Sequence, residues 1–115
     1  MLFDPNKWAM PEVPVRESDT VEVLKAARGS VEKHWCQYGT CYDGNTVGVC
    51  VIIALGNAAQ WPNGNDYDAA RKYFRAAVPL PKTISVPEWN DAPGRTQAEV
   101  LAAFDRAIEL ARADA

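Results

Sequence analysis

The sequence predicts a mainly α-helical fold, with about four helices forming a small bundle and one short β-hairpin between helices 1 and 2. Residues 19–34 and the segment after Thr96 repeat apolar side chains at the three- and four-residue spacing of a helix face. A different pattern separates the first two helices, because an Asp-Gly pair at 43–44 lies between two short segments rich in Tyr, Thr and Val. We therefore expect one helical domain over residues 18–115, preceded by an extended arm over residues 1–17.

The composition fits a single globular domain of 115 residues, 48% of them hydrophobic and 23% charged. Lys and Arg number 12 against 15 Asp and Glu, and the basic residues are scattered singly, so nonspecific binding to nucleic acid is disfavoured. The longest apolar stretch, residues 47–55, is about half the roughly 20 residues that a membrane span needs. The first residues lack the basic and apolar pattern of a secretory signal, so a cytoplasmic protein without membrane contact is expected.

Residues 1–17 combine three prolines with several apolar side chains. Pro5, Pro11 and Pro14 exclude a regular helix, while apolar residues such as Trp8 are too frequent for a purely disordered tail. We expect an arm packed on the domain. The alternative is that residues 1–17 dock on a second subunit and make a homo-oligomer.

The first helix is predicted over residues 19–34. Asp19 and Glu22 have the spacing of a capping box, which marks the start of a helix. The pair Gly29-Ser30 weakens the middle of this helix by about 1 kcal/mol relative to alanine, so a bend or frayed turn is expected there.

The hairpin is predicted around its turn at residues 43–44, where Asp-Gly suits the positive φ of a tight turn. An isolated hairpin is only marginally stable in water, so this one must pack against the helices. Tyr38, Tyr42 and Val47 are the side chains expected to make that contact.

Three further helices complete the prediction. Residues 49–59 are apolar on nearly every side, which favours a central helix, with a buried strand as the alternative. A Trp-Pro-Asn-Gly turn at 61–64 precedes a helix over 66–77, and prolines then impose an irregular crossing. Thr96 with Glu99 opens the last helix.

His34 is the only histidine, so a cysteine nucleophile with an imidazole base can be built only on it. The catalytic candidates are weak: His34, Cys36 and Cys50, for a Cys/His-dependent hydrolase. Neighbours on a helix point about 100 degrees apart, so His34 reaches Cys41 or Cys50 more readily than Cys36 once the hairpin folds back. The alternative is a capping or surface histidine beside small buried thiols.

The three cysteines are an odd number without a repeated C-x-x-C spacing, which argues against a disulfide framework and a zinc knuckle. Reduced thiols are expected, with a bridge from Cys50 to Cys36 or Cys41 as the alternative. Burial is also expected for Cys50, which has apolar neighbours on both sides. No metal is predicted, because His34, the cysteines and the aspartates have irregular spacing. No cofactor is predicted either, and the chain has no phosphate-binding glycine motif.

The sequence Trp89-Asn90-Asp91, followed by Pro93-Gly94, is typical of a fixed turn that inserts an indole into the core. A functional alternative is a shallow pocket in which these polar residues hydrogen-bond a ligand while an indole stacks on it. The binding candidates on that interpretation are Trp35, Trp89, Asn90 and Asp91.

Three stretches, residues 24–39, 50–58 and 89–108, resemble a family of small proteins of unknown function found in phages, prophages and actinobacteria. The shared features are a Trp-Cys element ending a helix, a Cys-x-x-Gly-Ala-Leu-x-x-Ala helix and a Trp-Asn-Asp turn before a final helix. The resemblance covers residues 20–112, although Ile53 stands where the pattern usually carries glycine. It implies a phage-related small cytosolic protein and brings no characterised activity, cofactor or catalytic residue.

The sequence therefore favours a noncatalytic binding or interaction protein, a phage- or prophage-associated accessory protein with a protein partner, acting on a host component. The sequence lacks paired carboxylates on one face, a phosphate loop and a credible triad, so no pattern in it supports an enzyme. The alternatives are a binder or sponge for a nucleotide or metabolite, the Cys/His-dependent hydrolase, and an oligomeric structural part.

Overall fold

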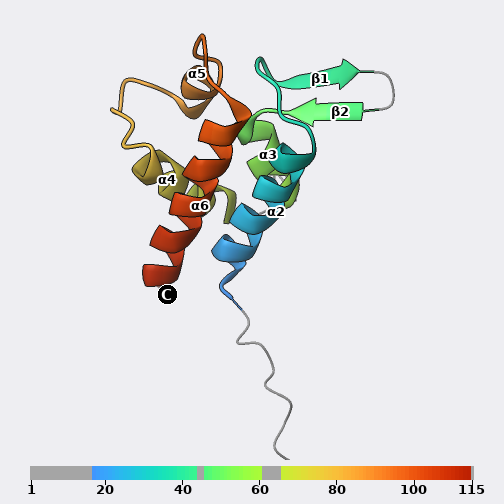
Figure 1. Ribbon diagram of the computed structural model, residues 1–115. Helices are drawn as coiled ribbons and strands as arrows, with labels where there is room; N and C mark the ends of the chain where they lie inside the picture. The colour runs from blue at the N-terminus through green and yellow to red at the C-terminus, as the bar shows by residue number, and fades with distance from the viewer. Residues whose placement is uncertain (1–16, 44–45, 61–65, 115) are drawn as a thin grey trace, which may run out of the picture.

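The computed structural model describes residues 17–43, 46–60 and 66–114. Within these ranges the chain forms five helices and one hairpin, which lies between the first two helices as predicted (Figure 1). In chain order the elements are α2 (Asp19–Lys33), β1 (Thr40–Asp43), β2 (Thr46–Val49), α3 (Val51–Ala58), α4 (Asp66–Ala77), α5 (Val86–Asn90) and α6 (Gln97–Ala113). The predicted arm, apart from Glu17, and the predicted turn at 61–64 lie outside the described residues.

Helix α2 begins at Asp19, as predicted, but its cap is the residue before. Ser18 is the N-cap, and its Oγ accepts a hydrogen bond of 3.3 Å from the backbone N–H of Val21. The helix then runs through Gly29-Ser30 without interruption, so the expected bend or frayed turn is absent. Packing against other helices on its buried face outweighs the low helix propensity of this pair.

The core forms where α2 packs against α3, α4 and α6. Phe74 of α4 and Phe104 of α6 meet at its centre edge to face, with ring centroids 4.9 Å apart. The apolar side chains with no exposed surface are Leu24, Ala27, Val31, Val51, Ala54, Leu55, Ala70, Phe74, Val100, Phe104 and Ala107. The predicted central helix is present as α3 and the buried strand is excluded, but the helix begins at Val51, because Val49 ends β2 and Cys50 is the N-cap.

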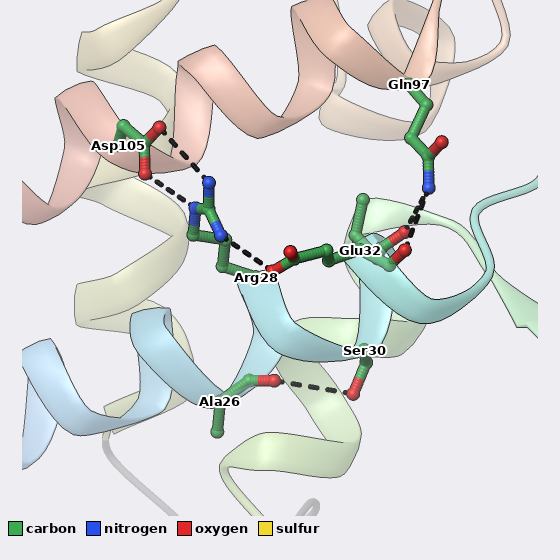
Figure 2. A network of polar contacts seen from close by, with 7 residues as sticks. Ala26, Arg28, Ser30, Glu32, Gln97 and Asp105 are labelled. Atoms are coloured by element: carbon green, nitrogen blue, oxygen red, sulfur yellow. Dashed lines mark hydrogen bonds and ion pairs between the residues drawn. The ribbon is translucent and has the colours of Figure 1, made fainter.

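Polar groups fix α2 against α6 along one side of the bundle (Figure 2). The Arg28 guanidinium donates to both carboxylate oxygens of Asp105 on α6, at 2.6 and 3.4 Å, and to Glu32 one turn along α2 at 2.9 Å. These carboxylates raise the pKa of Arg28, first through the Asp105 hydrogen bond. At the end of α2, the Gln97 Nε2 donates to the backbone oxygens of residues 31 and 32 at 2.8 and 3.2 Å. Gln97 thus satisfies carbonyls that a helix end leaves unpaired.

The opposite end of this helix pair carries a second bridge. Glu17 accepts hydrogen bonds from Arg112 of α6 at 2.6 and 2.7 Å, and from Lys25 at 3.3 Å. The Arg112 hydrogen bond lowers the pKa of Glu17 from 4.5 to about 2. The start of α2 is therefore tied to the end of α6 by charge.

Helix α5 lies in the segment predicted to be irregular. Ser85 and Glu88 form a capping box in which each side chain bonds the backbone N–H of the other, at 3.2 and 3.4 Å. Pro87 sits in the first turn, where a missing N–H costs nothing. The same motif recurs at Thr96 and Glu99, which confirms the predicted start of the last helix.

The hairpin pairs Tyr42 with Val47 and Cys41 with Gly48. A parallel bridge between Trp35 and Val49 joins β2 to the chain that leaves α2. Figure 1 shows the two strands extending sideways from the helices at the end of the molecule that also holds α5, away from the C-terminus. No helix in the described part of the chain is long and apolar enough to cross a membrane.

The prediction that three hairpin side chains lean on the helices is wrong. Tyr38 is 77% exposed, Tyr42 78% and Val47 51%. The hairpin is anchored instead by backbone bonds, because Cys36 N–H donates to the Val49 oxygen at 3.2 Å and Val49 N–H donates to the His34 oxygen at 3.1 Å.

Candidate functional site

Asn90, the last residue of α5, is the one polar side chain that is completely buried in the described ranges. Its Oδ1 accepts hydrogen bonds from Trp35 Nε1 at 2.8 Å and from the backbone N–H of Val51 at 3.2 Å. Its Nδ2 donates to the Cys36 backbone oxygen at 3.2 Å and to Asp91 Oδ1 at 2.9 Å. All four hydrogen bonds that an asparagine amide can make are therefore formed inside the protein.

The bond to Val51 gives Asn90 the role of an N-cap for α3. Cys50 occupies the N-cap position of that helix but makes no side-chain capping bond. The first N–H groups of a helix need partners, and one of them finds Asn90, 39 residues further along the chain. Asn90 consequently joins α5, the start of α3 and the segment after α2 in one buried contact.

The residues next to Asn90 hold the loop that leads into the hairpin. Asp91 Oδ1 accepts a 2.7 Å hydrogen bond from the backbone N–H of Tyr38, and Gln37 Nε2 donates to the backbone oxygens of Asn90 and Ala92 at 3.1 and 2.9 Å. Tyr38 has a φ of 64°, a left-handed conformation that is rare for a bulky residue. We call residues 89–92 the Asn90 turn, since these bonds make it the support of the loop.

Trp89 contributes to the same turn through its ring. It packs edge to face on Phe74 with ring centroids 5.4 Å apart, and the guanidinium carbon of Arg95 lies 4.0 Å from its centroid. Arg95 Nε also donates to the Trp89 backbone oxygen at 2.9 Å. The predicted turn that carries an indole into the core is present. Trp89 also lines a hollow of about 380 Å³ with Val78, which follows α4, and with residues of α6 such as Ala102.

The structure thus brings together three of the four predicted binding residues, Trp35, Asn90 and Asp91, with Trp89 on the other side of the turn. Their contacts are with one another and with the backbone. Asn90 has no hydrogen-bonding group left for a ligand, so the geometry favours the structural interpretation of this motif.

The thiols lie on the other face of the hairpin base. All three cysteines are free; Cys50 is buried, whereas Cys36 and Cys41 are partly exposed. Burial, and then the neighbouring Cys41 thiol, raise the pKa of Cys36 to about 12, so Cys36 stays protonated at neutral pH. Among the described residues, no group of three His, Cys, Asp or Glu side chains is placed to hold a metal ion.

His34 lies next to Cys41. A β-carbon at Gly48 would collide with His34 Cδ2 and with Cys41 Sγ, and it would lie 3.1 Å from His34 Nε2. The imidazole and the thiol therefore share the space above Gly48. This is the approach to Cys41 that the sequence suggested for His34.

The sequence interpretation missed a third feature, which we call the hairpin face: Tyr38, Tyr42 and Val47. All three are exposed, and Tyr42 and Val47 are direct cross-strand partners. The signal was present in the alternation of the strands, which places the partners of a register pair on one face. It was misread because apolar residues were assigned to the interior.

Fold and site together define a small helical domain that carries an exposed aromatic hairpin beside a turn whose buried Asn90 makes all of its hydrogen bonds inside the protein. The chain belongs to DUF6197, a family of unknown function, whose family model matches residues 16–110. Neither a curated protein nor a solved structure matches it. Ile53, where the sequence resemblance led us to expect glycine, packs partly buried against the core.

Proposed function

We propose that this protein is a noncatalytic interaction protein that binds a partner protein through the hairpin face. The observation that carries the proposal is the exposure of two tyrosines, 77% for Tyr38 and 78% for Tyr42, next to a backbone that Asp91 holds through the N–H of Tyr38. Tyrosine is enriched at protein interfaces because a rigid ring contributes a large contact area at little cost in side-chain entropy.

The backbone at Tyr38 supports this proposal. A left-handed conformation costs a bulky residue about 1–2 kcal/mol, a cost that glycine would avoid. The protein keeps a tyrosine there and holds it with the 2.7 Å bond to Asp91. Strain retained at an exposed position is typical of a residue selected for its side chain.

The pair Tyr42 and Val47 supports it independently. Alternation along β2 puts Val47 on the same face as Val49, which is 8% exposed and paired by a bridge with Trp35. The apolar face that is buried near the helices thus continues outward along the hairpin, where no described residue covers it. A partner that covered it would extend the core.

The chemistry of the hairpin face also suggests what fits it. Tyrosine presents an apolar ring with a hydroxyl at its tip. The matching partner surface is an apolar groove edged by hydrogen-bond acceptors. The family resemblance to phage and prophage proteins supports an accessory role in the cytoplasm, with a host protein as this partner.

Affinity capture with matched variants tests the proposal. The wild-type protein, a Tyr38→Ser/Tyr42→Ser/Val47→Ser variant and an Ile84→Ser control are used on the same host lysate. Ile84 is the matched control because it is an exposed apolar residue, 36% exposed, in the loop before α5. We expect a protein that the wild type and the control retain and the triple variant loses.

Two measurements complete the test. Denaturant unfolding must show that the triple variant is folded, and native mass spectrometry must show whether the wild type pairs with itself. A captured protein that binds the triple variant equally well contradicts the proposal. So does a homodimer that the triple substitution disperses, since the hairpin face would then be a contact between copies.

A second candidate function, binding of a small anionic molecule, is favoured by one hollow. It has a volume of about 480 Å³ between α4 and the segment 82–88, and Arg71, Arg75 and Lys82 line it. Arg75 is fixed there by bonds to the backbone oxygens of Ile84 and Pro81 at 2.9 and 3.0 Å. A concentration-dependent rise in melting temperature with ATP or inorganic phosphate, lost in an Arg71→Ala/Lys82→Ala variant, would establish it.

The hydrolase alternative finds less support. A cysteine nucleophile must ionise, but Cys36 has a pKa of about 12 and Cys50 is 4% exposed. Any hydrolytic activity that survives alanine at His34, Cys36 and Cys50 would exclude these residues as its source.

A further inference from the structure

The base of the hairpin gathers every thiol of the chain and its only histidine on one face. The bridge between Trp35 and Val49 places His34 beside Gly48 and Cys36 beside Cys50, on the face opposite to Trp35. The register pair of Cys41 with Gly48 places the Cys41 side chain on that same face. Two rows therefore face the same way, one running from His34 across Gly48 to Cys41 and the other containing Cys36 and Cys50.

Gly48 allows His34 and Cys41 to approach each other. Without a side chain at that position, the His34 ring and the Cys41 sulfur occupy the space that a β-carbon would need, with His34 Nε2 only 3.1 Å from it. Cys36 is the neighbouring thiol, and its Sγ donates to the Gly39 backbone oxygen at 3.5 Å. Cys36 and Cys41 are both partly exposed, so a small molecule in solution can reach this pair.

We propose that Cys41 and Cys36 form an oxidation site for small hydroperoxides, in which Cys41 is oxidised first and Cys36 then closes a disulfide with it. The inference does not depend on the proposed partner binding, because it concerns the opposite face of the hairpin.

The chemistry balances in two steps. The Cys41 thiol gives its proton to His34, and the thiolate attacks the terminal oxygen of the hydroperoxide, which breaks the O–O bond. Cys41 becomes a sulfenic acid, and the leaving alkoxide or hydroxide takes a proton from the imidazolium. The Cys36 sulfur then attacks the Cys41 sulfur, which forms the S–S bond and releases water with the Cys36 proton. Two thiols are oxidised and one peroxide is reduced to an alcohol and water.

The roles of the two sulfurs follow from their surroundings. Cys41 has the imidazole that can accept its proton, so it attacks the peroxide. Burial and the Cys41 thiol raise the pKa of Cys36 to about 12, so Cys36 does not start the reaction. It attacks only the sulfenic acid on Cys41, whose leaving hydroxyl takes up the Cys36 proton as the S–S bond forms. Cys50 is 4% exposed beneath them and takes no part.

Hydrogen peroxide is the probe for the test. After treatment of the full chain, blocking of the remaining thiols and proteolysis, we expect a peptide pair joined through Cys36 and Cys41, with Cys50 blocked as a free thiol. In a Cys36→Ser variant the reaction should stop at a sulfenic acid on Cys41, which dimedone traps as a stable adduct. In a Cys41→Ser variant no disulfide should form.

Two controls separate reactivity from folding. A Cys50→Ala variant should form the same disulfide at the wild-type rate. A His34→Gln/Cys36→Ser variant should form the Cys41 adduct at least about tenfold more slowly than Cys36→Ser alone, since loss of a proton acceptor costs rate. Circular dichroism of each variant confirms that it is folded before the rates are compared.

The opposite results are equally clear. A disulfide that includes Cys50, three thiols that stay free at peroxide concentrations that oxidise free cysteine, or a Cys41 adduct that forms at the same rate without His34 would each overturn the assignment.

Discussion

The Asn90 turn and the hairpin face are neighbours, but the side chains of the first make contacts inside the protein and those of the second are exposed. The turn has an indole, an amide and a carboxylate, and nearly all of their contacts are internal: Asn90 is fully buried and makes four hydrogen bonds. The hairpin face has two phenol rings and a valine, all more than half exposed. One side chain links them, because Asp91 in the turn accepts the N–H of Tyr38.

The difference shows that a conspicuous motif need not mark a binding surface. Trp-Asn-Asp is distinctive because a buried asparagine needs one specific set of partners, and few substitutions preserve it. The hairpin face consists of ordinary residues that become notable only once their exposure is known. The turn is the support, and the residues it supports are the candidates for recognition.

The largest effect that would test this comparison is expected at Asn90. Asn90→Ala leaves the Trp35 and Val51 N–H groups and the Cys36 oxygen without partners, so we expect a loss of about 3 kcal/mol or more in the free energy of unfolding. Denaturant titration followed by tryptophan fluorescence measures it.

Two substitutions serve as controls for that measurement. Asn57→Ala removes an exposed asparagine from α3 and should change stability by less than about 0.5 kcal/mol. Asn90→Asp keeps the acceptor for Trp35 and Val51 but places a carboxylate against the Cys36 oxygen and Asp91, so it should also destabilise. An Asn90→Ala protein as stable as the wild type would show that the turn supports nothing.

A smaller effect of opposite sign is expected at Tyr38. Tyr38→Gly relieves the left-handed strain, partly offset by the greater freedom of glycine in the unfolded chain, and should raise stability by about 1 kcal/mol. The same change removes an exposed ring and should weaken capture of the partner. A Tyr38→Gly protein that is less stable than the wild type would mean that the ring serves the fold, which would remove the main support for the hairpin face.

Gly29→Ala is the matched stabilising change in the helical body. A β-carbon at Gly29 has no neighbour within 4 Å, and alanine is the better helix former, so stability should rise by roughly 0.5–1 kcal/mol. Unlike Tyr38→Gly, it should leave partner capture unchanged. Loss of capture in both variants would mean that stabilisation itself, rather than the ring, controls binding.

The smallest effect concerns Glu17, at the end of the bundle away from the hairpin. Its folded pKa of about 2 lies below the ordinary 4.5, so its contribution is present above pH 4.5 and is lost as the pH falls from 4.5 to 2. Glu17→Gln should therefore lower the melting temperature slightly at pH 7 and have no effect near pH 2. Glu109→Gln removes an exposed carboxylate of α6 that acts on Arg112 only through its charge, without a hydrogen bond, so it should show a much weaker convergence.

The sequence predicted those elements whose signals are local. The last helix follows from its capping box and apolar period, the helix over 66–77 from its apolar period, and the hairpin from the two segments rich in Tyr, Thr and Val. The turn itself was placed one residue too early, because Asp43 ends β1 and pairs with Thr46. Helix α5 was missed because the prolines around it suggested irregular chain, although Ser85 and Glu88 carried the capping box.

The site was less predictable because its contacts are long-range. Nothing near Cys50 in the sequence indicates that Asn90 caps α3, and nothing near Tyr38 indicates that Asp91 holds its N–H. The sequence did gather Trp35, Asn90 and Asp91 as candidates, and His34 with Cys41. It could not show whether their hydrogen bonds point inward or toward a ligand, since that depends on which atoms lie opposite.

The cap that Asn90 places on α3 has a consequence for how the chain is made. The first turn of α3 lacks this partner until a residue 39 positions later has left the ribosome and been fixed by α5. During synthesis, α3 therefore cannot take its final place in the core until the segment that contains α5 has been made. Ribosome-bound chains that stop short of Asn90 should stay sensitive to protease, whereas released full-length chains should become resistant.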